Sequence, residues 1–447
     1  MAGGIWLSQN KTRPGAYINF KAVQKGAMTV GDRGIVAIGL PLNWGDENKL
    51  IEVLSSSLLD GSSQKLVGFT AFDADSKLLA GALKYCYKAL VFRMNGGGVK
   101  ARAVIGAFIA TAKYSGTFGN KVIIAVSTDS VTGIHTVITY VDGSTVDTQK
   151  VAEISELESN SYVDFSANTE STEWADTAGT ALEGGTNGEV NTSTAYPALF
   201  NLLKMAKWQC YACLSSDVSV KANTVSFIRQ MRDDEGRYVQ AVVADYDGAD
   251  YEGIINSVSG CVIDGVSFTK EEFVSCVAGM TAGANFNESN TARTVDGASS
   301  IIGELTDAEI KEGLQNGKFI LSTSTSGKVK VEQDINSLHT YSKDRNYNFS
   351  KNRVIRTLDE IGTTTVQTWE DTYMGKVDND STGRSLFKSD LIQYGNELQR
   401  LRGIQEFNGT DDIQVEQGRD LDSVLCTWGV KPVDSMEKLY MTVNGNS

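Results

Sequence analysis

The chain has 447 residues, of which 41% are hydrophobic and 21% charged, a balance that is ordinary for a folded protein and excludes wholesale disorder. Its formal net charge of −14 argues against general binding to nucleic-acid backbones, which depends on clustered Lys and Arg. No apolar stretch has the length of a signal peptide or a membrane span, so we expect folding in a cytoplasm with the six cysteines reduced.

Both ends of the chain are predicted to form single β-strands with no partner nearby in the sequence. The front strands lie at 5–7 and 16–20, and the closing strand lies at 436–443. The unpaired edge of a strand templates pairing with another chain, which is a liability in a monomer. We therefore expect a subunit that is joined to its neighbours through added strands.

Residues 34–94 alternate between strand and helix patterns. In chain order the pattern gives a strand at 35–40, a helix capped by Asp46, a strand at 66–72, a helix started by Ser76 and a strand at 90–92. The first helix is expected to place Leu50, Ile51, Leu54 and Leu58 on one face. The β-α-β-α-β order predicts a layered α/β unit.

A change of composition follows the run 95–98, which is predicted to be a flexible junction. Dense β-branched runs occupy 122–126 and 136–141, and the second run meets Asp142-Gly143, a strong signal for a hairpin turn. Residues 99–180 are therefore expected to form a small β domain. Its last part, 166–180, is polar and predicts a loop or linker.

Helix and strand patterns resume near Thr194, which is expected to cap a helix with Pro197 in its first turn. Strands at 209–214 and 238–244 are expected to flank a helix at 218–232. The β domain thus interrupts an α/β domain.

Two capping boxes follow, in which a Thr and a Glu three residues later satisfy each other's backbone amides. They are Thr269 with Glu272 and Thr306 with Glu309, and the second helix is expected to end at Gly317.

From about Leu338 onward the sequence is locally basic within an acidic protein. Helices are predicted at about 351–361 and 384–402. The second helix combines apolar and basic side chains: Leu386, Phe387, Ile392, Leu398 and Leu401 with Arg384, Lys388, Arg400 and Arg402. It is either an ordinary surface helix or a helix that docks against an acidic protein surface, and the residues alone leave both open.

Three sets of residues could carry catalysis or bind a metal: the histidines His135 and His339, the pair Cys210 and Cys213, and the carboxylates Asp245, Asp247 and Asp250. Two histidines are too few for a triad or a His-based metal site. The cysteine pair lies in an apolar strand without a second pair, and the carboxylates fail the spacing of a calcium loop. No glycine pattern for phosphate opens a helix. We therefore predict no catalytic, cofactor-binding or metal site.

Three stretches carry a resemblance to a known family: 4–20 with its Arg-Pro-Gly-Ala-Tyr-Ile-Asn-Phe, 112–121 with Ala-Lys-Tyr-Ser-Gly-Thr-Phe-Gly-Asn-Lys, and 432–443 with Pro-Val-Asp-Ser-Met-Glu-Lys-Leu-Tyr-Met-Thr-Val. They resemble the contractile tail sheath family of myophages and R-type bacteriocins, especially its branch in Gram-positive bacteria. The closing stretch is the most specific. Ser115 stands where the family often has Pro and Phe118 where it often has Trp, which alters local turn stiffness and packing. The similarity in organisation spans nearly the whole chain.

The resemblance implies a multidomain α/β and α+β fold: a layered α/β core, an inserted small β domain, and a C-terminal α+β lattice-forming domain with exchanged terminal strands. The implied divisions are an N-terminal linker arm at 1–20, the α/β core at 21–98 and 181–337, the outward-facing inserted β domain at 99–180, the C-terminal lattice and tube-facing domain at 338–436, and a C-terminal linker strand at 437–447.

The resemblance also implies a function: a structural subunit, not an enzyme, of a sheath that polymerises helically around an inner tube and contracts to drive the tube through a target cell envelope. The implied residues for strand exchange between subunits are Ile5, Trp6, Leu7, Ala16, Tyr17, Ile18, Asn19, Phe20, Lys438, Leu439, Tyr440, Met441, Thr442 and Val443. The residues expected to face the tube are Arg384, Lys388, Arg400 and Arg402.

The implied partners are further copies of the chain, the inner tail tube protein, and baseplate and tail terminator proteins, with no cofactor, no direct nucleic acid and no membrane insertion. Assembly is expected in the cytoplasm of a bacterial host, and the product is a virion tail or a released bacteriocin particle. The alternatives are another self-assembling lattice or baseplate protein, or an α/β nucleotide-binding enzyme.

Overall fold

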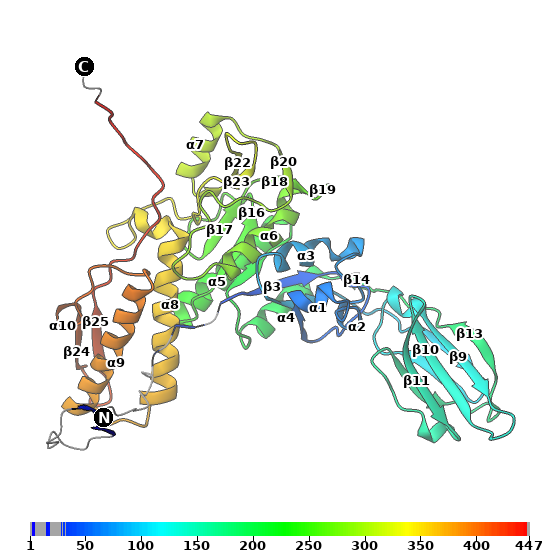
Figure 1. Cartoon of the computed structure of the whole chain (residues 1–447). Helices are drawn as coiled ribbons and strands as arrows, with labels where there is room; N and C mark the ends of the chain where they lie inside the picture. The colour runs from blue at the N-terminus through cyan, green and yellow to red at the C-terminus, as the bar shows by residue number, and fades with distance from the viewer. Residues whose placement is uncertain (1, 5–14, 18–27, 29, 32, 445–447) are drawn as a thin grey trace. The chain divides into compact units, whose positions relative to one another are not determined.

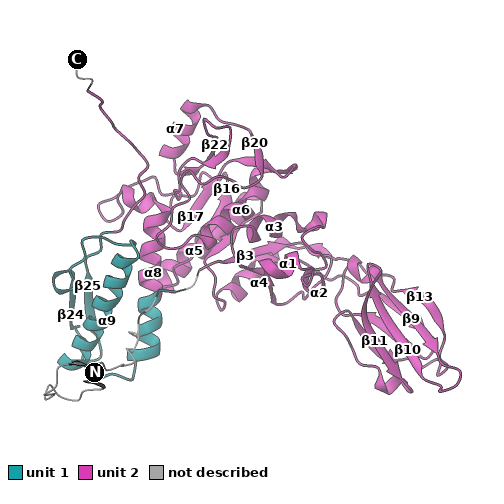
Figure 2. Cartoon of the chain, in the orientation of Figure 1, with its two compact units in different colours: residues 1–31, 364–431 teal, residues 32–363, 432–447 magenta. Residues whose placement is uncertain are grey.

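The computed structural model describes residues 2–4, 15–17, 28, 30–31 and 33–444. It divides into two compact units: unit 1 comprises Met1–Gly31 and Thr364–Lys431, and unit 2 comprises Asp32–Thr363 and Pro432–Ser447 (Figure 2). Helices and several separate sheets are combined in one chain, which confirms the prediction of a multidomain α+β protein. In the part of the chain that the structure describes, no helix combines the length and the apolar character that a membrane crossing needs.

Unit 2 is built on a seven-stranded sheet with the order β21-β17-β16-β15-β3-β5-β4. Its strands β17, β16 and β3 are labelled in Figure 1. Neighbouring strands are parallel except for the edge strand β4, which is antiparallel to β5. The strands are β3 (Ile35–Leu40), β4 (Leu50–Leu54), β5 (Lys88–Arg93), β15 (Cys210–Ala212), β16 (Gln240–Ala244), β17 (Ile254–Ser257) and β21 (Lys318–Phe319). A parallel sheet of this kind must be covered on both faces.

Two apolar clusters cover the two faces of the sheet. Alternate residues of β3 point to opposite sides, so Val36 and Ile38 join one cluster and Ile35 and Ala37 the other. The first cluster includes side chains of α3 (Lys77–Leu83) and α6 (Lys270–Gly283), and the second those of α4 (Thr192–Leu203) and α5 (Val218–Arg229). Helix α6 lies so close to α3 that a Cβ at Gly279 would sit 2.2 Å from the Ala82 carbonyl oxygen. The layered α/β core is confirmed.

Two elements of the first α/β segment differ from the prediction. The helix expected from Asp46 is wrong: Leu50–Leu54 forms the edge strand β4, followed by the short helix α1 (Ser55–Leu59). Pairing with β5 and burial of alternate residues override the helical spacing of the leucines. The strand expected at 66–72 is also wrong, because helix α2 (Gln64–Val67) ends at Gly68, whose φ of 83° suits only a helix C-cap or a turn. The 3-10 turn η1 (Ala74–Ser76) then leads into α3.

The inserted β-rich part packs two sheets around one apolar core. The sheets have the orders β12-β8-β7 and β11-β10-β9-β13. The strands are β7 (Arg102–Ile105), β8 (Phe108–Ala112), β9 (Val122–Thr128), β10 (His135–Val141), β11 (Ser144–Val151), β12 (Val163–Ala167) and β13 (Thr177–Ala181), with 3-10 turns η2 (Thr117–Lys121) and η3 (Ile154–Glu156). The hairpin turn at Asp142-Gly143 is confirmed, with φ of 46° and 76°. The end of the predicted polar loop is a strand instead, because β13 pairs with β9.

The junction at 95–98 is held by hydrogen bonds, so its description as flexible is wrong. Strand β6 (Asn95–Gly96) pairs with β14 (Glu189–Val190). The buried Asn95 side chain accepts from Leu42 N at 2.7 Å and donates to the Leu42 carbonyl at 2.8 Å. Trp44, which follows β3, is fully buried in the core of the β-rich part, 5.2 Å from Tyr114 and 5.1 Å from Phe118 between ring centres.

The remainder of unit 2 agrees closely with the local signals. Helix α4 is capped by Asn191, three residues before the expected Thr194, and α5 continues as a π-turn η4 (Gln230–Asp234). Both capping boxes are confirmed, at α6 and at α7 (Asp307–Gln315), and Gly317 follows the C-cap Asn316 with a φ of 67°. The remaining strands and turn are β18 (Gly260–Ile263), β19 (Val266–Phe268), β20 (Ala298–Ile302), β22 (Leu321–Thr323), β23 (Val329–Val331) and η5 (Tyr347–Ser350).

Helix α8 (Asn352–Thr368) begins where predicted, runs seven residues further, and contributes residues to both units. In unit 1 it is followed by the π-turn η6 (Trp369–Tyr373), α9 (Ser381–Arg400), α10 (Gly409–Asp412), β24 (Ile413–Gln417) and β25 (Val424–Trp428). The helix predicted at 384–402 is α9, which begins earlier because Asp380 caps it and ends before Arg402, whose φ is 60°.

The front of the chain contains a pair of short strands. Strand β1 (Ala2–Gly4) is parallel to β2 (Gly15–Tyr17), with Ala2 opposite Gly15. The prediction that the front strands lack a partner nearby in the sequence is therefore wrong for β2. Ala16 and Tyr17 lie in β2, whereas Ile5–Leu7 and Ile18–Phe20 lie outside the described residues.

Candidate interface at the ends of the chain

The closing segment of the chain has two parts with opposite surroundings. We call residues 432–437 the arm root and residues 438–444 the arm. The root ends in a buried ion pair, whereas the arm has no helix or strand and is exposed throughout (red in Figure 1). Leu439 is 83% exposed and Tyr440 89% exposed. An apolar segment left in water in this way is suited to covering by another protein surface.

Glu437 is the residue that fixes the arm root. Its carboxylate accepts hydrogen bonds from Thr291 Oγ1 at 2.8 Å and from Gln333 Nε2 at 2.6 Å, and it forms an ion pair with Lys351. The Glu437 and Lys351 side chains are only 10% and 6% exposed. Burial alone would raise the pKa of Glu437, but the bonds from Lys351, Gln333 and Thr291 outweigh it and hold this pKa below its usual value.

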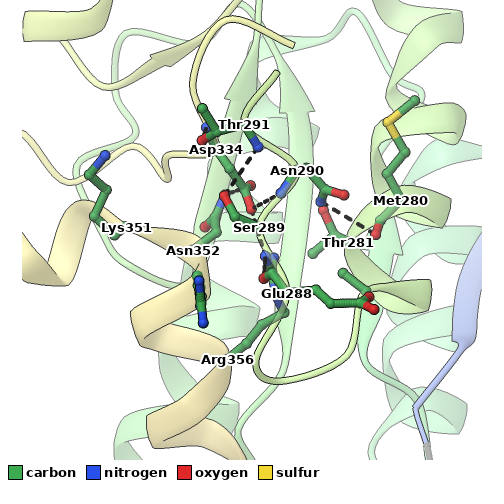
Figure 3. A network of polar contacts seen from close by, with 12 residues as sticks. Met280, Thr281, Glu288, Ser289, Asn290, Thr291, Asp334, Lys351, Asn352 and Arg356 are labelled. Carbon is green, nitrogen blue, oxygen red and sulfur yellow. Dashed lines mark hydrogen bonds and ion pairs between the residues drawn. The ribbon is translucent and has the colours of Figure 1, made fainter. Parts of the chain in front are cut away.

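A second buried carboxylate, Asp334, is joined to this pair through Thr291. Figure 3 shows Asp334 with Thr291, Asn290 and Asn352 around it. Its oxygens accept from Asn290 N at 2.8 Å, Asn352 Nδ2 at 2.9 Å and Arg356 Nη2 at 2.6 Å. Its backbone N donates to Thr291 Oγ1 at 2.9 Å, so the Thr291 hydroxyl bridges Asp334 and Glu437. We call Asp334 and its partners Asn290, Thr291, Asn352 and Arg356 the Asp334 network.

Three segments supply the side chains of this site. The loop after α6 carries Asn290 and Thr291, the loop after β23 carries Gln333 and Asp334, and Lys351 precedes the first turn of α8. An isolated bridge between Ile335 and Lys351 aligns the last two segments. Each loop leaves the α/β core at a well-packed element, so the polar groups meet in fixed positions.

Strands β24 and β25 form a two-stranded antiparallel sheet in unit 1, with Ile413 opposite Trp428. Ile413 is buried, and Trp428 packs against Tyr394 of α9 with ring centres 6.2 Å apart. Leu425 and Cys426 of β25 are exposed. Within the described residues these two strands pair only with each other, which leaves both outer edges of the sheet open. A two-stranded sheet is marginal alone and gains stability from further strands.

The four basic residues proposed to face a tube make local contacts on or after α9. Arg384 donates to the Asn379 carbonyl at 3.0 Å, and Lys388 donates to the Thr410 carbonyl at 3.3 Å. Arg400 is exposed and forms a two-bond pair with Glu397 at 2.6 and 2.7 Å, and Arg402 is exposed. Among the apolar residues of this helix, Phe387 and Leu398 are buried whereas Leu386 is exposed.

The residues that could have carried catalysis or metal binding are engaged elsewhere. His135 stacks on Trp174 at 3.9 Å, and His339 Nδ1 lies 2.9 Å from the Ser337 carbonyl. Asp245 pairs with Lys270 at 2.8 Å, and Asp250 accepts from His339 N at 2.9 Å.

The paired cysteines Cys210 and Cys213 are buried, and burial raises the pKa of both thiols. Among the described residues, no three His, Cys, Asp or Glu side chains are grouped so that they could hold a metal ion.

The sequence did not point to Thr291, Gln333 or Lys351 as part of this site. Lys351 belongs to a basic run and Glu437 to a distinctive closing stretch, but nothing local indicates that the two meet 86 positions apart. Long-range ion pairs of this kind have no periodic signature in a single sequence.

Comparison with protein families finds phage tail sheath domains along the chain. A phage tail sheath beta-sandwich domain matches residues 96–187, a phage tail sheath central domain matches 193–337, and a phage tail sheath C-terminal domain matches 344–445. The phage-like element PBSX protein XkdK of Bacillus subtilis (strain 168) is 32% identical, over 100% of both chains.

Solved structures give the same result. The sheath tail protein of Desulfitobacterium hafniense is 36% identical, with a TM-score of 0.81 over 96% of this chain and 99% of that one. The sheath tail protein of Listeria innocua is 34% identical, with a TM-score of 0.82 over 93% and 96%. The helical sheath of the anti-feeding prophage in its contracted state is 9% identical, with a TM-score of 0.59 over 98% of this chain and 100% of that one, which shows a shared fold.

Proposed function

The chain belongs to the phage tail sheath family and is a structural subunit of a contractile tail sheath; from this premise, we propose that its subunits polymerise helically around an inner tube and are linked through their terminal segments. The observation that carries the proposal is the arm: Lys438–Val443 exposes Leu439, Tyr440, Met441 and Val443 and pairs with no strand among the described residues, immediately after a root that is fixed by a buried ion pair. Such a segment is suited to completing a sheet in another copy of the chain.

The acceptor we propose is the β24–β25 sheet of a neighbouring subunit. Its open edges provide unpaired backbone groups, and helix α9 packs against it through Tyr394 and Trp428. The arm residues Lys438–Val443 would add one strand, and the front residues Ile5–Leu7 and Ala16–Phe20 a second. Added strands bind mainly through main-chain hydrogen bonds, which keep subunits connected while their other contacts change.

Deletion of residues 438–447 tests the link. The deletion removes only exposed residues of the described arm, so the subunit should fold with an unchanged thermal unfolding midpoint but should fail to form stable sheath. Negative-stain microscopy and sedimentation of the polymer measure the result. Tubes of ordinary length and yield from the shortened chain would contradict strand exchange through this end.

We further propose that α9 and the turn after it face the tube in the extended state, with Arg384, Lys388, Arg400 and Arg402 against an acidic tube surface. The reversal Lys388→Glu, Arg400→Glu and Arg402→Glu should impair assembly on the tube. The control is Lys311→Glu on α7, which reverses an exposed helical lysine that pairs with Asp307. Tail assembly that is unaltered in the triple variant would contradict this orientation.

Contraction is proposed to release free energy that was stored during assembly, with no nucleotide and no catalytic step. Subunits would move as nearly rigid bodies to a shorter and wider lattice with more favourable contacts. In this scheme the C-terminal domain at 338–436 and the N-terminal arm at 1–20 form the lattice, the α/β core at 21–98 and 181–337 supports it, and the β domain at 99–180 faces outward.

The partners that follow are other copies of the chain, the inner tail tube protein, and baseplate and tail terminator proteins, without direct contact with nucleic acid or membrane. Assembly is proposed in the cytoplasm of the bacterial host, before incorporation into a virion tail or a bacteriocin particle. Isolation of the assembled particle, followed by identification of its proteins by mass spectrometry, tests this partner set.

A further inference from the structure

We propose that Glu437 is the positioning residue of the C-terminal arm: its buried pair with Lys351 is the joint that holds the arm root, and the Asp334 network passes tension on the arm into the α/β core. This inference rests on the proposed function, because it assumes that the arm links subunits. It concerns how the arm is held by its own subunit, which is separate from what the arm binds.

The first step is the number of bonds that Glu437 accepts. One carboxylate oxygen accepts from Thr291 Oγ1 at 2.8 Å and Ser435 Oγ at 3.2 Å, and the other accepts from Gln333 Nε2 at 2.6 Å and from Lys351 Nζ. Charge-assisted bonds are about twice as strong as neutral ones, and four of them around one carboxylate restrict it to one orientation. Glu437 therefore fixes both the place and the direction in which the arm begins.

The second step is that the apolar side chains next to Glu437 are not buried. Met436 is fully exposed, and Leu439 and Tyr440 on the other side are exposed as well. The residues around Glu437 thus contribute little hydrophobic stabilisation to the root. A buried ion pair is costly to break from one side only, because the remaining charge is left without a partner.

The third step is the connection behind the pair. The Thr291 hydroxyl donates to Glu437 and accepts from Asp334 N, and the Asp334 carboxylate binds Asn290, Asn352 and Arg356 (Figure 3). Asp334, Asn352 and Arg356 are all buried. A pull on Glu437 therefore acts on the loop after α6, the loop after β23 and the first turns of α8 together, and none of these segments bears it alone.

The test compares full-length variants by two measurements: the yield of sedimentable tubes, and amide hydrogen exchange at the root in dispersed subunits. Exchange is followed at Asn290, Asp334 and Ile335, whose amides donate hydrogen bonds to Asp334, Thr291 and Gln333. Glu437→Gln keeps the size of the side chain but removes the nearer counter-charge of Lys351, which keeps only Asp434 at 4.0 Å. We expect exchange at the root to become roughly 10- to 100-fold faster, which corresponds to the loss of about one charge-assisted bond, and tube yield to fall. Lys351→Arg keeps the cation and should preserve both readouts.

Two further variants separate the joint from general destabilisation. Thr291→Val has the same shape but removes the hydroxyl bridge, so it should lower tube yield while the subunit stays folded. The matched control is Glu406→Gln, which breaks an exposed ion pair with Lys431 just before the root and should change neither readout. The double variant Glu437→Gln with Lys351→Met should show less effect than the sum of its single changes.

Several outcomes would overturn the inference. Root exchange in Glu437→Gln equal to that of the unaltered chain would show that the pair does not hold the root. Faster exchange with a normal tube yield would show that the joint carries no tension. Normal tubes from the chain shortened by residues 438–447 would instead contradict the proposed function, while the exchange result would stand by itself.

Discussion

The apolar core of the α/β layers and the polar seam along the start of α8 stabilise the same unit by different means. In the core, β16 is buried along its whole length and Phe273 of α6 is fully buried among apolar side chains. In the seam, Arg356 pairs with Asp334, and Arg232 pairs with Asp359 through two bonds at 2.7 and 2.8 Å. Apolar packing is strong but has no direction, whereas these bonds set the position of α8.

The comparison teaches where each kind of contact is useful. Burial of apolar area supplies most of the folding free energy, while a buried ion pair often contributes little net stability relative to apolar side chains of the same volume. A seam of buried charges next to the arm root therefore argues for a role in orientation. The following predictions test that contrast.

The largest expected effect is loss of core packing. Phe273→Ala should lower the free energy of unfolding by about 3–5 kcal/mol, because it removes a fully buried ring and leaves a cavity. Chemical denaturation of dispersed subunits measures the change. A loss of less than about 1 kcal/mol would show that the core is not closely packed around α6.

The seam should respond differently to single and double changes. Arg232→Met leaves Asp359 buried without its partner and should cost about 3 kcal/mol, whereas Arg232→Met with Asp359→Leu should recover most of that loss. Denaturation curves of the two variants measure the difference. Equal losses in both variants would mean that the pair acts as ordinary packing, and the contrast with the core would disappear.

The joint at the arm root should depend on pH. The pKa of Glu437 is held below its ordinary value of 4.5, so its stabilising contribution is complete above that value and is lost as the pH falls through the lower, folded-state pKa. Amide protection at Asn290, Asp334 and Ile335, expressed relative to the intrinsic exchange rate at each pH, should therefore fall on acidification in the unaltered chain and much less in Glu437→Gln. Parallel pH profiles for the two chains would refute this contribution.

The smallest effect is expected at an exposed pair. Lys311 and Asp307 on α7 are paired at 2.5 Å with both side chains largely in water, so Lys311→Ala should change the free energy of unfolding by only about 0.3–0.5 kcal/mol. The same denaturation assay measures it. A loss comparable to that of Arg232→Met would show that burial does not distinguish the seam from the surface.

Local signals predicted much of the fold. The capping boxes at Thr269 and Thr306 and the Asp142-Gly143 turn are confirmed because each depends on residues within three positions of one another. Leu50–Leu54 was predicted wrongly because its leucines fit a helical face equally well, and only pairing with β5 decides in favour of a strand. The apolar run at 66–72 was misread for a related reason, since Gly68 ends a short helix there.

The candidate site was less accessible to sequence reasoning than the fold. The closing stretch around Glu437 stood out, but its contacts with Thr291 and Gln333 join segments that are far apart in the chain. The Asp334 network has the same character, because no pattern in one sequence pairs Asp334 with Arg356 across two loops. The terminal strand residues outside the described part of the chain remain proposals.

Cys426 of β25 gives the molecule an intrinsic chemical reporter. It is the exposed member of the chain's six free cysteines, the other five being buried, and it lies in the sheet proposed to receive a neighbour's arm. A maleimide dye should thus attach at one place in the native subunit without any engineered cysteine. The rate of that attachment before and after polymerisation would register whether this strand becomes covered, so sheath assembly can be followed by the accessibility of a single sulfur atom.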